Sequence, residues 1–184
     1  MQSPKPFYIV VIPEGTVMTE LLRLQKLLSQ AFKMYTKPYP TLHLTVGVFS
    51  HCQEVERAFP ILQNITASLA PFSVKIQGEC SFKAPLLSVG VHIQSHSLNC
   101  LAGKLEGSLI QAGFSPHSFA HWDFHISLVN PIFACRRWSN AEFTQASRFI
   151  ERHAPSGSAT VSHLELWSPT FPPLNILGQF PFAK

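Results

Sequence analysis

Two short stretches of this sequence share one pattern: residues 41–49 read TLHLTVGVF and residues 122–130 read WDFHISLVN. Each contains a histidine, an apolar residue, a hydroxyl residue and a second apolar residue, as HLTV from His43 and HISL from His125. Successive side chains of a β-strand point to opposite faces, so each histidine shares a face with the hydroxyl two residues later. The pattern predicts two strands that each bury one apolar face and present an imidazole and a hydroxyl on the other.

Composition limits the class of protein. The chain has 184 residues, enough to bury a core in one large domain or two small lobes. Its net charge of +4 suits an anionic ligand, although lysines and arginines are scattered apart from the adjacent Arg136 and Arg137. The four cysteines form no C-x-x-C pair, and no run approaches the ~18 apolar residues of a membrane span. We expect no signal peptide, because the first apolar run, residues 7–12, is too short for one. We therefore expect a cytoplasmic protein with reduced thiols and no membrane association.

Strand-like and helical periodicities alternate along the chain. The first half predicts a strand, a helix, the first histidine strand, a helix and a strand, at about residues 7–12, 17–34, 41–49, 53–69 and 72–77. The second half repeats this order at about residues 86–93, 98–110, 122–130, 140–152 and 160–167, with a last strand at 176–182 and a loop at 78–85. The repeat predicts a single bilobal domain over residues 1–184. Its fold class is α+β, with two pseudo-symmetric lobes of duplicated β-α-β units and antiparallel sheets flanking a central cleft.

The paired motifs suggest acid–base chemistry. Two imidazoles facing one cleft can serve as general base and general acid, because their unperturbed pKa of about 6.5 lies near neutral pH. The hydroxyls of Thr45 and Ser127, with backbone amides, can hold an anionic group between the rings. A phosphodiester suits this arrangement: one imidazole takes a proton from water, the other protonates the leaving ribose oxygen, and the hydroxyls stabilise the transition state. This scheme needs no metal or other cofactor, and it does not say which histidine is the acid.

Two other chemistries fit the sequence less well. A zinc site would need further ligands beside His43 and His125, but neither motif contains a cysteine, and Asp123 is the single aspartate of the chain. A Ser–His–Asp hydrolase would need a nucleophile elbow of the form G-x-S-x-G, which is absent from the sequence. We therefore expect no metal at the site.

The paired H-L-T-V and H-I-S-L motifs in duplicated lobes resemble the two-histidine (2H) phosphoesterase superfamily, which includes RNA 2′,3′-cyclic phosphodiesterases, also called 2′-5′ RNA ligase-like proteins. The successive segments FYIVVIP, LLRLQKLL and PTLHLTVGVF are similar to the first lobe of that family in order and spacing. The resemblance covers nearly the whole chain. It implies catalytic roles for His43 and His125 and phosphate binding by Thr45 and Ser127.

Further residues are candidates for substrate contacts. Many members of the family carry an arginine soon after the second motif; here Arg136 and Arg137 come later and are the candidates for a phosphate contact. Aromatic rings near the motifs could stack on a base, at ~1–3 kcal/mol per base. The candidates are Tyr35, Tyr39, Phe49, Trp122 and Trp167. Of these we favour Tyr39 and Phe49, which flank the first motif, and Trp167, which ends a strand of the second lobe. Phe49 falls on the same predicted face as the first histidine.

The sequence thus predicts a metal-independent phosphodiesterase acting on 2′,3′-cyclic phosphate ends or 2′-5′ linkages of RNA or small nucleotides, and we expect a monomer. One alternative is a non-catalytic RNA- or nucleotide-binding module on the same fold. Another is an α+β interaction domain whose low charge and 15 phenylalanines form a partner surface. The presence of both histidines favours the enzyme. RNA ends, 2′-5′ oligoadenylates, ADP-ribose cyclic phosphate and cyclic-nucleotide signals all fit these residues, and reverse ligation stays open.

Overall fold

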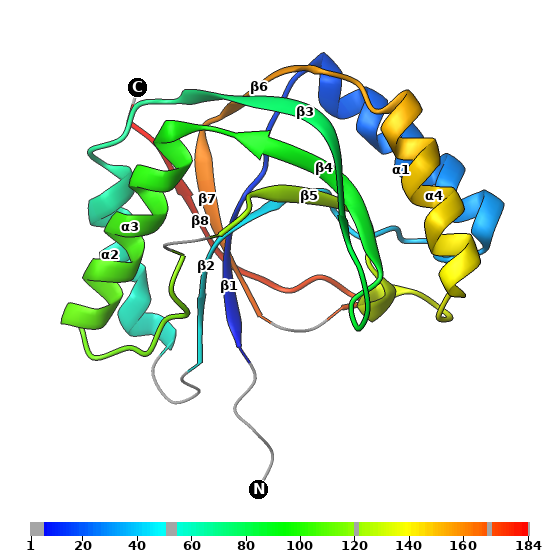
Figure 1. The fold of residues 1–184 in the computed structure, drawn as a ribbon. Helices are drawn as coiled ribbons and strands as arrows, with labels where there is room; N and C mark the ends of the chain where they lie inside the picture. Colours follow the sequence, from blue (N-terminus) through cyan, green and yellow to red (C-terminus); the bar gives the residue numbers. More distant parts are fainter. Residues whose placement is uncertain (1–5, 51–54, 120–121, 169–170, 184) are drawn as a thin grey trace, which may run out of the picture.

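The computed structural model describes residues 6–50, 55–119, 122–168 and 171–183 (Figure 1). The first half of the chain forms β1 (Phe7–Val11), α1 (Thr16–Phe32), β2 (Leu44–Phe49), the short 3-10 helix η1 (Val55–Arg57), α2 (Ala58–Thr66) and β3 (Phe72–Phe82). The second half forms β4 (Ser88–Gln94), α3 (His96–Gln111), β5 (His125–Val129), the 3-10 helix η2 (Pro131–Phe133), α4 (Asn140–His153), β6 (Gly157–Val161), β7 (His163–Trp167) and β8 (Ile176–Pro181).

Two four-stranded antiparallel sheets form the centre of the molecule. Sheet A has the strand order β2-β1-β7-β8, and sheet B has the order β5-β4-β3-β6. Each half of the chain gives strands to the sheet of the other half, because β3 joins β4 in sheet B while β7 joins β1 in sheet A. The predicted α+β fold with two duplicated lobes and antiparallel sheets is confirmed. The two halves exchange strands, so each lobe contains strands from both halves of the chain.

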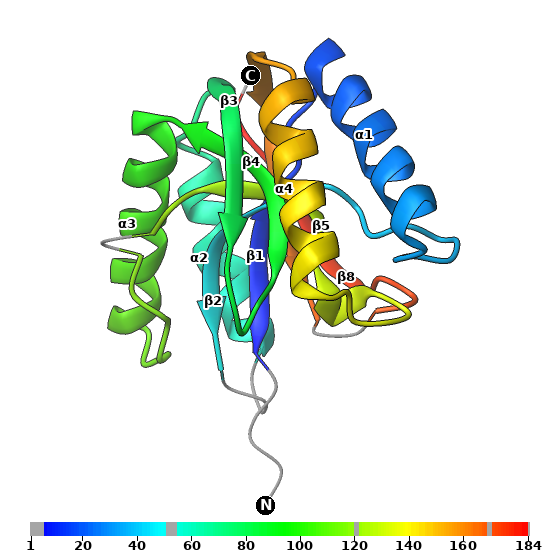
Figure 2. The same cartoon turned by 45° about the vertical axis from the view of Figure 1, so that its right-hand side comes forward.

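The helices cover one face of each sheet. Helices α2 and α3 pack on sheet A, and α1 and α4 lie side by side on sheet B (Figure 1 and Figure 2). The alternation along β1 divides the two faces: Ile9 and Val11 belong to the core that the helices complete, and Val10 between them does not. We call the face away from the helices the inner face. Strands β2 and β5 are the edge strands of their sheets and contact each other, which brings the two histidine motifs together.

The structure corrects two strand predictions. Residues 78–85, expected as a loop, belong in part to β3, which pairs with β4 as far as Phe82. Gly78 has a φ of +69° and is skipped where the register shifts, so this glycine forms a bulge within the strand instead of ending it. Residues 160–167, expected as one strand, are divided at Ser162, where the chain passes from β6 in sheet B to β7 in sheet A.

The four predicted helices are confirmed within a few residues of their ends. The expected start of the second helix at residue 53 lies outside the described residues. Pro60 lies in the first turn of α2, where a residue without a backbone N–H is tolerated. Within the described part of the chain, no helix is long and apolar enough to cross a membrane.

Candidate active site

The first motif lies at the edge of sheet A as the alternation predicts. His43 immediately precedes β2, and Thr45 is its second residue. Leu42, Leu44 and Val46 are buried, whereas His43 and Thr45 are half-buried. The apolar side chains thus anchor the strand in the core while the imidazole and the hydroxyl face inward between the sheets.

The second motif repeats this arrangement at the edge of sheet B. His125 and Ser127 are half-buried on β5, and the intervening Ile126 and the following Leu128 are fully buried. His125 pairs with His92 of β4, so the two imidazoles lie side by side on neighbouring strands. His92 has no counterpart in the sequence motif, and only the pairing of the strands identifies it as a neighbour of the site.

A β-bulge follows the hydroxyl residue in each motif. In β2 the pairs Val10–Thr45 and Ile9–Gly47 leave Val46 without a partner, and β5 skips Leu128 in the same way. A bulge shifts every later residue to the opposite face of the sheet. This shift corrects the prediction for Phe49.

Phe49 lies on the helix-covered face of sheet A. It is fully buried, and its ring packs 5.6 Å from that of Phe7 and 5.1 Å from that of Phe114. A ring enclosed in the core has no face to offer a nucleobase. The structure therefore assigns Phe49 to the core and not to the inner face.

Both imidazoles are oriented by the same backbone contact. The Nδ1 atom of His43 lies 2.8 Å from the carbonyl oxygen of Thr41, and that of His125 lies 2.8 Å from the carbonyl oxygen of Asp123. A carbonyl can only accept a hydrogen bond, so each Nδ1 carries a proton and donates it. The neutral ring then has an unprotonated Nε2, which can accept a proton from water or, once protonated, return one to a leaving group.

An aromatic ring packs against each imidazole with nearly the same geometry. The ring centroids of His43 and Trp167 are 4.5 Å apart at 59°, and those of His125 and Phe82 are 4.5 Å apart at 56°. Trp167 on β7 and Phe82 on β3 occupy equivalent positions. Each lies on the third strand of its sheet, counted from the edge strand that carries the histidine motif. Trp167 therefore lies at the site as expected, but it packs on the histidine; its stacking on a base stays a prediction. Phe82 is missed by the sequence reasoning, which places it in a loop.

Burial sets the electrostatics of both rings. It lowers the pKa of His43 and of His125 below the ordinary value of 6.5, although the bond to the preceding carbonyl raises each pKa in part. The charge of His125 further lowers the pKa of His43, so the two rings are close enough to influence each other. The nearby His92 lowers the pKa of His125, and Asp123 raises it. Neutral imidazoles are therefore favoured at both positions before an anion binds.

A buried carboxylate lies behind His43. Glu165 is 5% exposed, and its carboxylate accepts hydrogen bonds of 2.6 Å from the indole Nε1 of Trp167 and of 2.6 Å from the amide Nε2 of Gln179. The Nε2 atom of His163 lies 3.5 Å from the same group. The negative charge of Glu165 raises the pKa of His43. The sequence motifs do not identify Glu165, because it lies on β7, which is distant in the sequence and pairs with β1 only in the folded protein.

A different group occupies the equivalent position in sheet B. Glu165 and Thr45 both pair with Val10, whereas Cys80 and Ser127 both pair with Gly90. Burial is the main cause that raises the pKa of Cys80 to about 11, so its thiol is uncharged at neutral pH. The two motifs thus share their geometry, but a carboxylate occupies this position near the first motif and an uncharged thiol occupies it near the second.

The hydroxyl of Ser127 has a buried neighbour that the sequence does not reveal. The Oγ of Ser88 lies 3.3 Å from the Oγ of Ser127 and donates a hydrogen bond of 3.1 Å to the carbonyl oxygen of Val129. Since a hydroxyl has one proton, Ser88 then accepts from Ser127. Ser127 must turn its proton away from Ser88 to donate to a phosphate oxygen.

Tyr39 is half-buried beside a second tyrosine. Its ring lies 6.2 Å from that of Tyr35, whose hydroxyl accepts a hydrogen bond of 2.6 Å from the backbone N–H of Asn130. Burial raises the pKa of Tyr35 to about 12. Tyr39 is thus linked to the segment that follows β5, and a stacking role for it stays a prediction.

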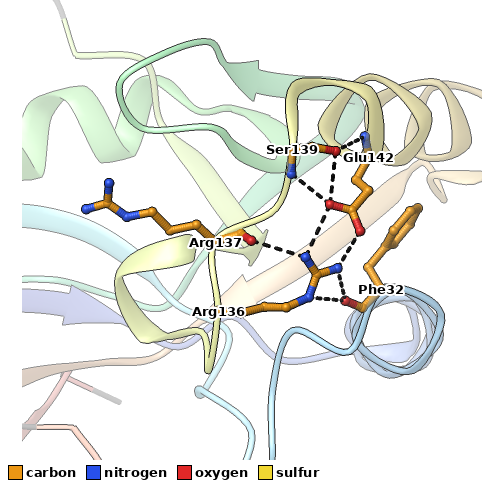
Figure 3. Close-up of polar contacts among 5 residues, drawn as sticks. All are labelled: Phe32, Arg136, Arg137, Ser139 and Glu142. Carbon is orange, nitrogen blue, oxygen red and sulfur yellow. Dashed lines mark hydrogen bonds and ion pairs between the residues drawn. The ribbon is translucent and has the colours of Figure 1, made fainter.

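Arg136 is bound within the fold, which corrects its predicted role (Figure 3). Its Nε and Nη2 donate to the carbonyl oxygen of Phe32 at 3.1 and 2.7 Å, and Nη1 donates to that of Arg137 at 3.1 Å. Both Nη atoms also bind the carboxylate of Glu142, which closes the capping box of α4 with Ser139. The guanidinium thereby ties the end of α1 to the start of α4, and a phosphate contact does not fit it. The Arg137 side chain points away from this cluster, and its phosphate contact stays a prediction.

Over the ranges that the structure describes, no group of three or more His, Cys, Asp or Glu side chains could hold a metal ion.

Comparison with known proteins supports the fold. No protein-family model matches the sequence, and no curated protein matches it either. Among solved structures, Escherichia coli LigT in complex with 3′-AMP matches with a TM-score of 0.67 at 13% identity, over 98% of this chain and 99% of LigT. TT0787 of Thermus thermophilus matches with a TM-score of 0.63 at 14% identity, over 96% of this chain and 97% of that chain. The ns2 PDE domain of MHV matches with a TM-score of 0.59 at 12% identity, over 88% and 98%.

The chain has the fold of the 2H phosphoesterases. LigT, TT0787 and the ns2 domain are members of that superfamily, so the resemblance seen in the sequence extends to the three-dimensional structure. The matches span nearly the full length of both chains, and the duplicated arrangement of two antiparallel sheets is therefore common to them. At 12–14% identity the likeness concerns the fold, and the chemistry must be argued from the residues of this chain.

Proposed function

We propose that this protein is a phosphodiesterase that hydrolyses 2′,3′-cyclic phosphate ends or 2′-5′ linkages of RNA or small nucleotides by two-histidine acid–base catalysis without a metal. The observation that carries the proposal is the repeated site on the contacting edge strands β2 and β5. There two imidazoles, each tied through Nδ1 to a carbonyl oxygen at 2.8 Å, stand beside Thr45 and Ser127. This arrangement offers two proton-transfer groups and two hydroxyl donors to one phosphate.

The charged neighbours divide the two roles. Burial and the charge of His125 lower the pKa of His43 more than the buried carboxylate of Glu165 raises it, and the Asp123 that raises the pKa of His125 is exposed. Because Glu165 is the one buried carboxylate beside either ring in the described residues, we assign the proton, and the role of general acid, to His43 on its position and not on the net pKa shift. His125 takes a proton from water, whose oxygen attacks phosphorus. His43 protonates the ribose oxygen as its bond to phosphorus breaks, while Thr45 and Ser127 donate to the non-bridging oxygens.

The solved neighbours fit this chemistry. LigT has been crystallised with 3′-AMP, phosphate, NADP+ and ATP, and the ns2 domain is described as a PDE domain. These ligands are nucleotides or a phosphate, the class of molecule that we propose for this chain. The resemblance of the two motifs to those of the family supports the same roles for the histidines and the hydroxyls.

Hydrolysis in EDTA tests the proposal. A short RNA with a 2′,3′-cyclic phosphate end and a 2′-5′-linked diadenylate are incubated with the wild-type protein, His43→Ala and His125→Ala. We expect turnover that resists EDTA and falls by ~10²-fold or more in each variant. His153→Ala is the matched control, because this exposed histidine lies on α4 and its Nδ1 bonds the carbonyl oxygen of Phe149. It should retain full activity.

The same experiment distinguishes the proposed enzyme from a non-catalytic nucleotide-binding module. A non-catalytic module would bind nucleotides with no turnover on either substrate, and its two histidine variants would change affinity alone. Turnover that EDTA abolishes would instead contradict the metal-independent mechanism while leaving the phosphodiesterase in place.

A further inference from the structure

A cavity of about 350 Å³ adjoins the second histidine motif. Its lining includes His92, Trp122 and Asp123, together with Asn99 from the first turn of α3. Three of these residues are tied to the motif: His92 pairs with His125, Asp123 supplies the carbonyl that orients it, and the Trp122 ring lies 6.4 Å from it. The cavity therefore lies just beyond the start of β5, next to the proposed general base.

Trp122 offers a flat apolar surface at this place. It is 36% exposed, and its ring is within 27° of parallel to the imidazole of His125. The buried ring of Phe119 supports it at 4.6 Å and packs in turn on the buried Phe124. An exposed indole held by a buried aromatic pair is a rigid surface on which a planar ring can stack.

The polar lining supplies acceptors beside this surface. The Nδ2 of Asn99 donates to the backbone carbonyl of Ser95 at 3.3 Å, which directs its Oδ1 elsewhere as an acceptor. The carboxylate of Asp123 is exposed and also accepts hydrogen bonds. An apolar ring with a few polar groups around it is the usual lining of a small-ligand pocket, and 350 Å³ lies within the range of such pockets.

The position equivalent to Trp122 in the first motif is not aromatic. Trp122 precedes its histidine by three residues, and the residue three before His43 is Pro40, whose carbonyl accepts a hydrogen bond of 2.9 Å from Gln25. A proline that anchors the chain to α1 presents no aromatic face. This difference favours the His125 side as the place where a planar group of the substrate stacks.

We infer that this cavity is a nucleobase subsite in which the base of the substrate stacks on Trp122. The inference rests on the proposed function and specifies its substrate: a nucleoside whose base lies beside His125 while its phosphate lies between the two motifs. A cyclic phosphodiester without a base should then be a poor substrate that gains nothing from this cavity.

Two substrates and two variants of Trp122 test the subsite. Adenosine 2′,3′-cyclic phosphate carries a base, and glycerol 1,2-cyclic phosphate has the same five-membered cyclic phosphodiester without one. Trp122→Ala should lower kcat/KM for the adenosine substrate by ~5- to 150-fold, the range that one base–aromatic stack supports. It should leave kcat/KM for the glycerol substrate unchanged. Trp122→Phe, which keeps a ring, should restore much of the loss.

Phe133→Ala is the matched control. Phe133 is 37% exposed, close to the value for Trp122, but it lies in η2 beyond the opposite end of β5. It should leave the ratio of the two kcat/KM values unchanged. A fall for both substrates in Trp122→Ala, or for neither, would overturn the subsite even if hydrolysis by the wild type supports the proposed function.

If the wild type hydrolyses neither substrate, the subsite is tested by binding measurements. Titration calorimetry with AMP and with inorganic phosphate then replaces kinetics. Weaker binding of AMP but not of phosphate by Trp122→Ala would support the subsite although the proposed function fails. Unchanged binding of AMP, or none to the wild type, would overturn the subsite. Asn99→Ala, which truncates the polar lining, should likewise weaken AMP more than phosphate.

Discussion

The spacing between β4 and β5 depends on a single glycine. Gly90 pairs with Ser127, and a Cβ at this position would lie 2.1 Å from the carbonyl oxygen of Ile126 and 3.0 Å from the Cα of Ser127. Carbon and carbonyl oxygen atoms in close contact are normally at least ~3.3 Å apart. In Gly90→Ala, β5 must therefore move by roughly 1 Å, and it carries Ser127 and His125 with it.

This displacement should harm catalysis more than folding. A misplacement of about 1 Å can cost ~10²-fold in rate, whereas an extra methyl in a packed site costs about 1–3 kcal/mol of stability. We expect Gly90→Ala to fold with a lower melting temperature and to lose about two orders of magnitude in kcat/KM on the cyclic-phosphate RNA. Circular dichroism melts and steady-state kinetics on the same samples measure both.

Two glycines of α3 provide the control. A Cβ at Gly103 or Gly107 would meet nothing within 4 Å, so alanine there should keep activity and stabilise the helix by up to ~1 kcal/mol. If folded Gly90→Ala had wild-type kcat/KM, the argument that the β4–β5 spacing positions the second motif would be refuted.

Three further predictions concern charge. Glu165→Gln removes the charge that raises the pKa of His43, so the alkaline limb of the pH–rate profile should move to lower pH; an unmoved limb would contradict the assignment of His43 as acid. Arg136→Ala should lower the melting temperature because its guanidinium joins α1 to α4, and Arg137→Ala should not; equal melting temperatures would count against this bridge. Burial lowers the native pKa of His43 and His125, so the unfolded state binds protons first as pH falls. Urea unfolding should therefore show stability decreasing below about pH 6.5, and the double alanine variant should flatten that dependence.

The histidine strands could be predicted because their signal is local. A half-buried edge strand leaves its alternation in the sequence, and the two motifs alternate as the burial of Leu42, Leu44, Ile126 and Leu128 requires. The same locality limits the prediction. The extra residue at Val46 moves the side chains after it to the opposite face of the sheet, and a valine in the sequence does not indicate a bulge.

The missed residues come from strands that pair across the two halves. Phe82 and Glu165 reach the site because β3 and β7 cross to the other sheet, and neither lies near a motif in the sequence. Arg136 shows the converse. It follows the second motif closely enough to suggest a phosphate contact, but its partners are a carbonyl at the end of α1 and a carboxylate at the start of α4. Such long-range pairings are decided by packing and not by local pattern.

Strand exchange also explains how a duplicated site could acquire two different roles. Duplication alone gives two equal histidines, and acid–base catalysis needs one that holds a proton and one that accepts it. The strand behind His43 comes from the second half and carries Glu165, whereas the strand behind His125 comes from the first half and carries Cys80. The pKa of His43 is thus raised by a carboxylate from the other half of the chain, whereas the charged neighbours of His125, which are Asp123 and His92, lie in its own half. In our proposal neither half could therefore form a competent site alone.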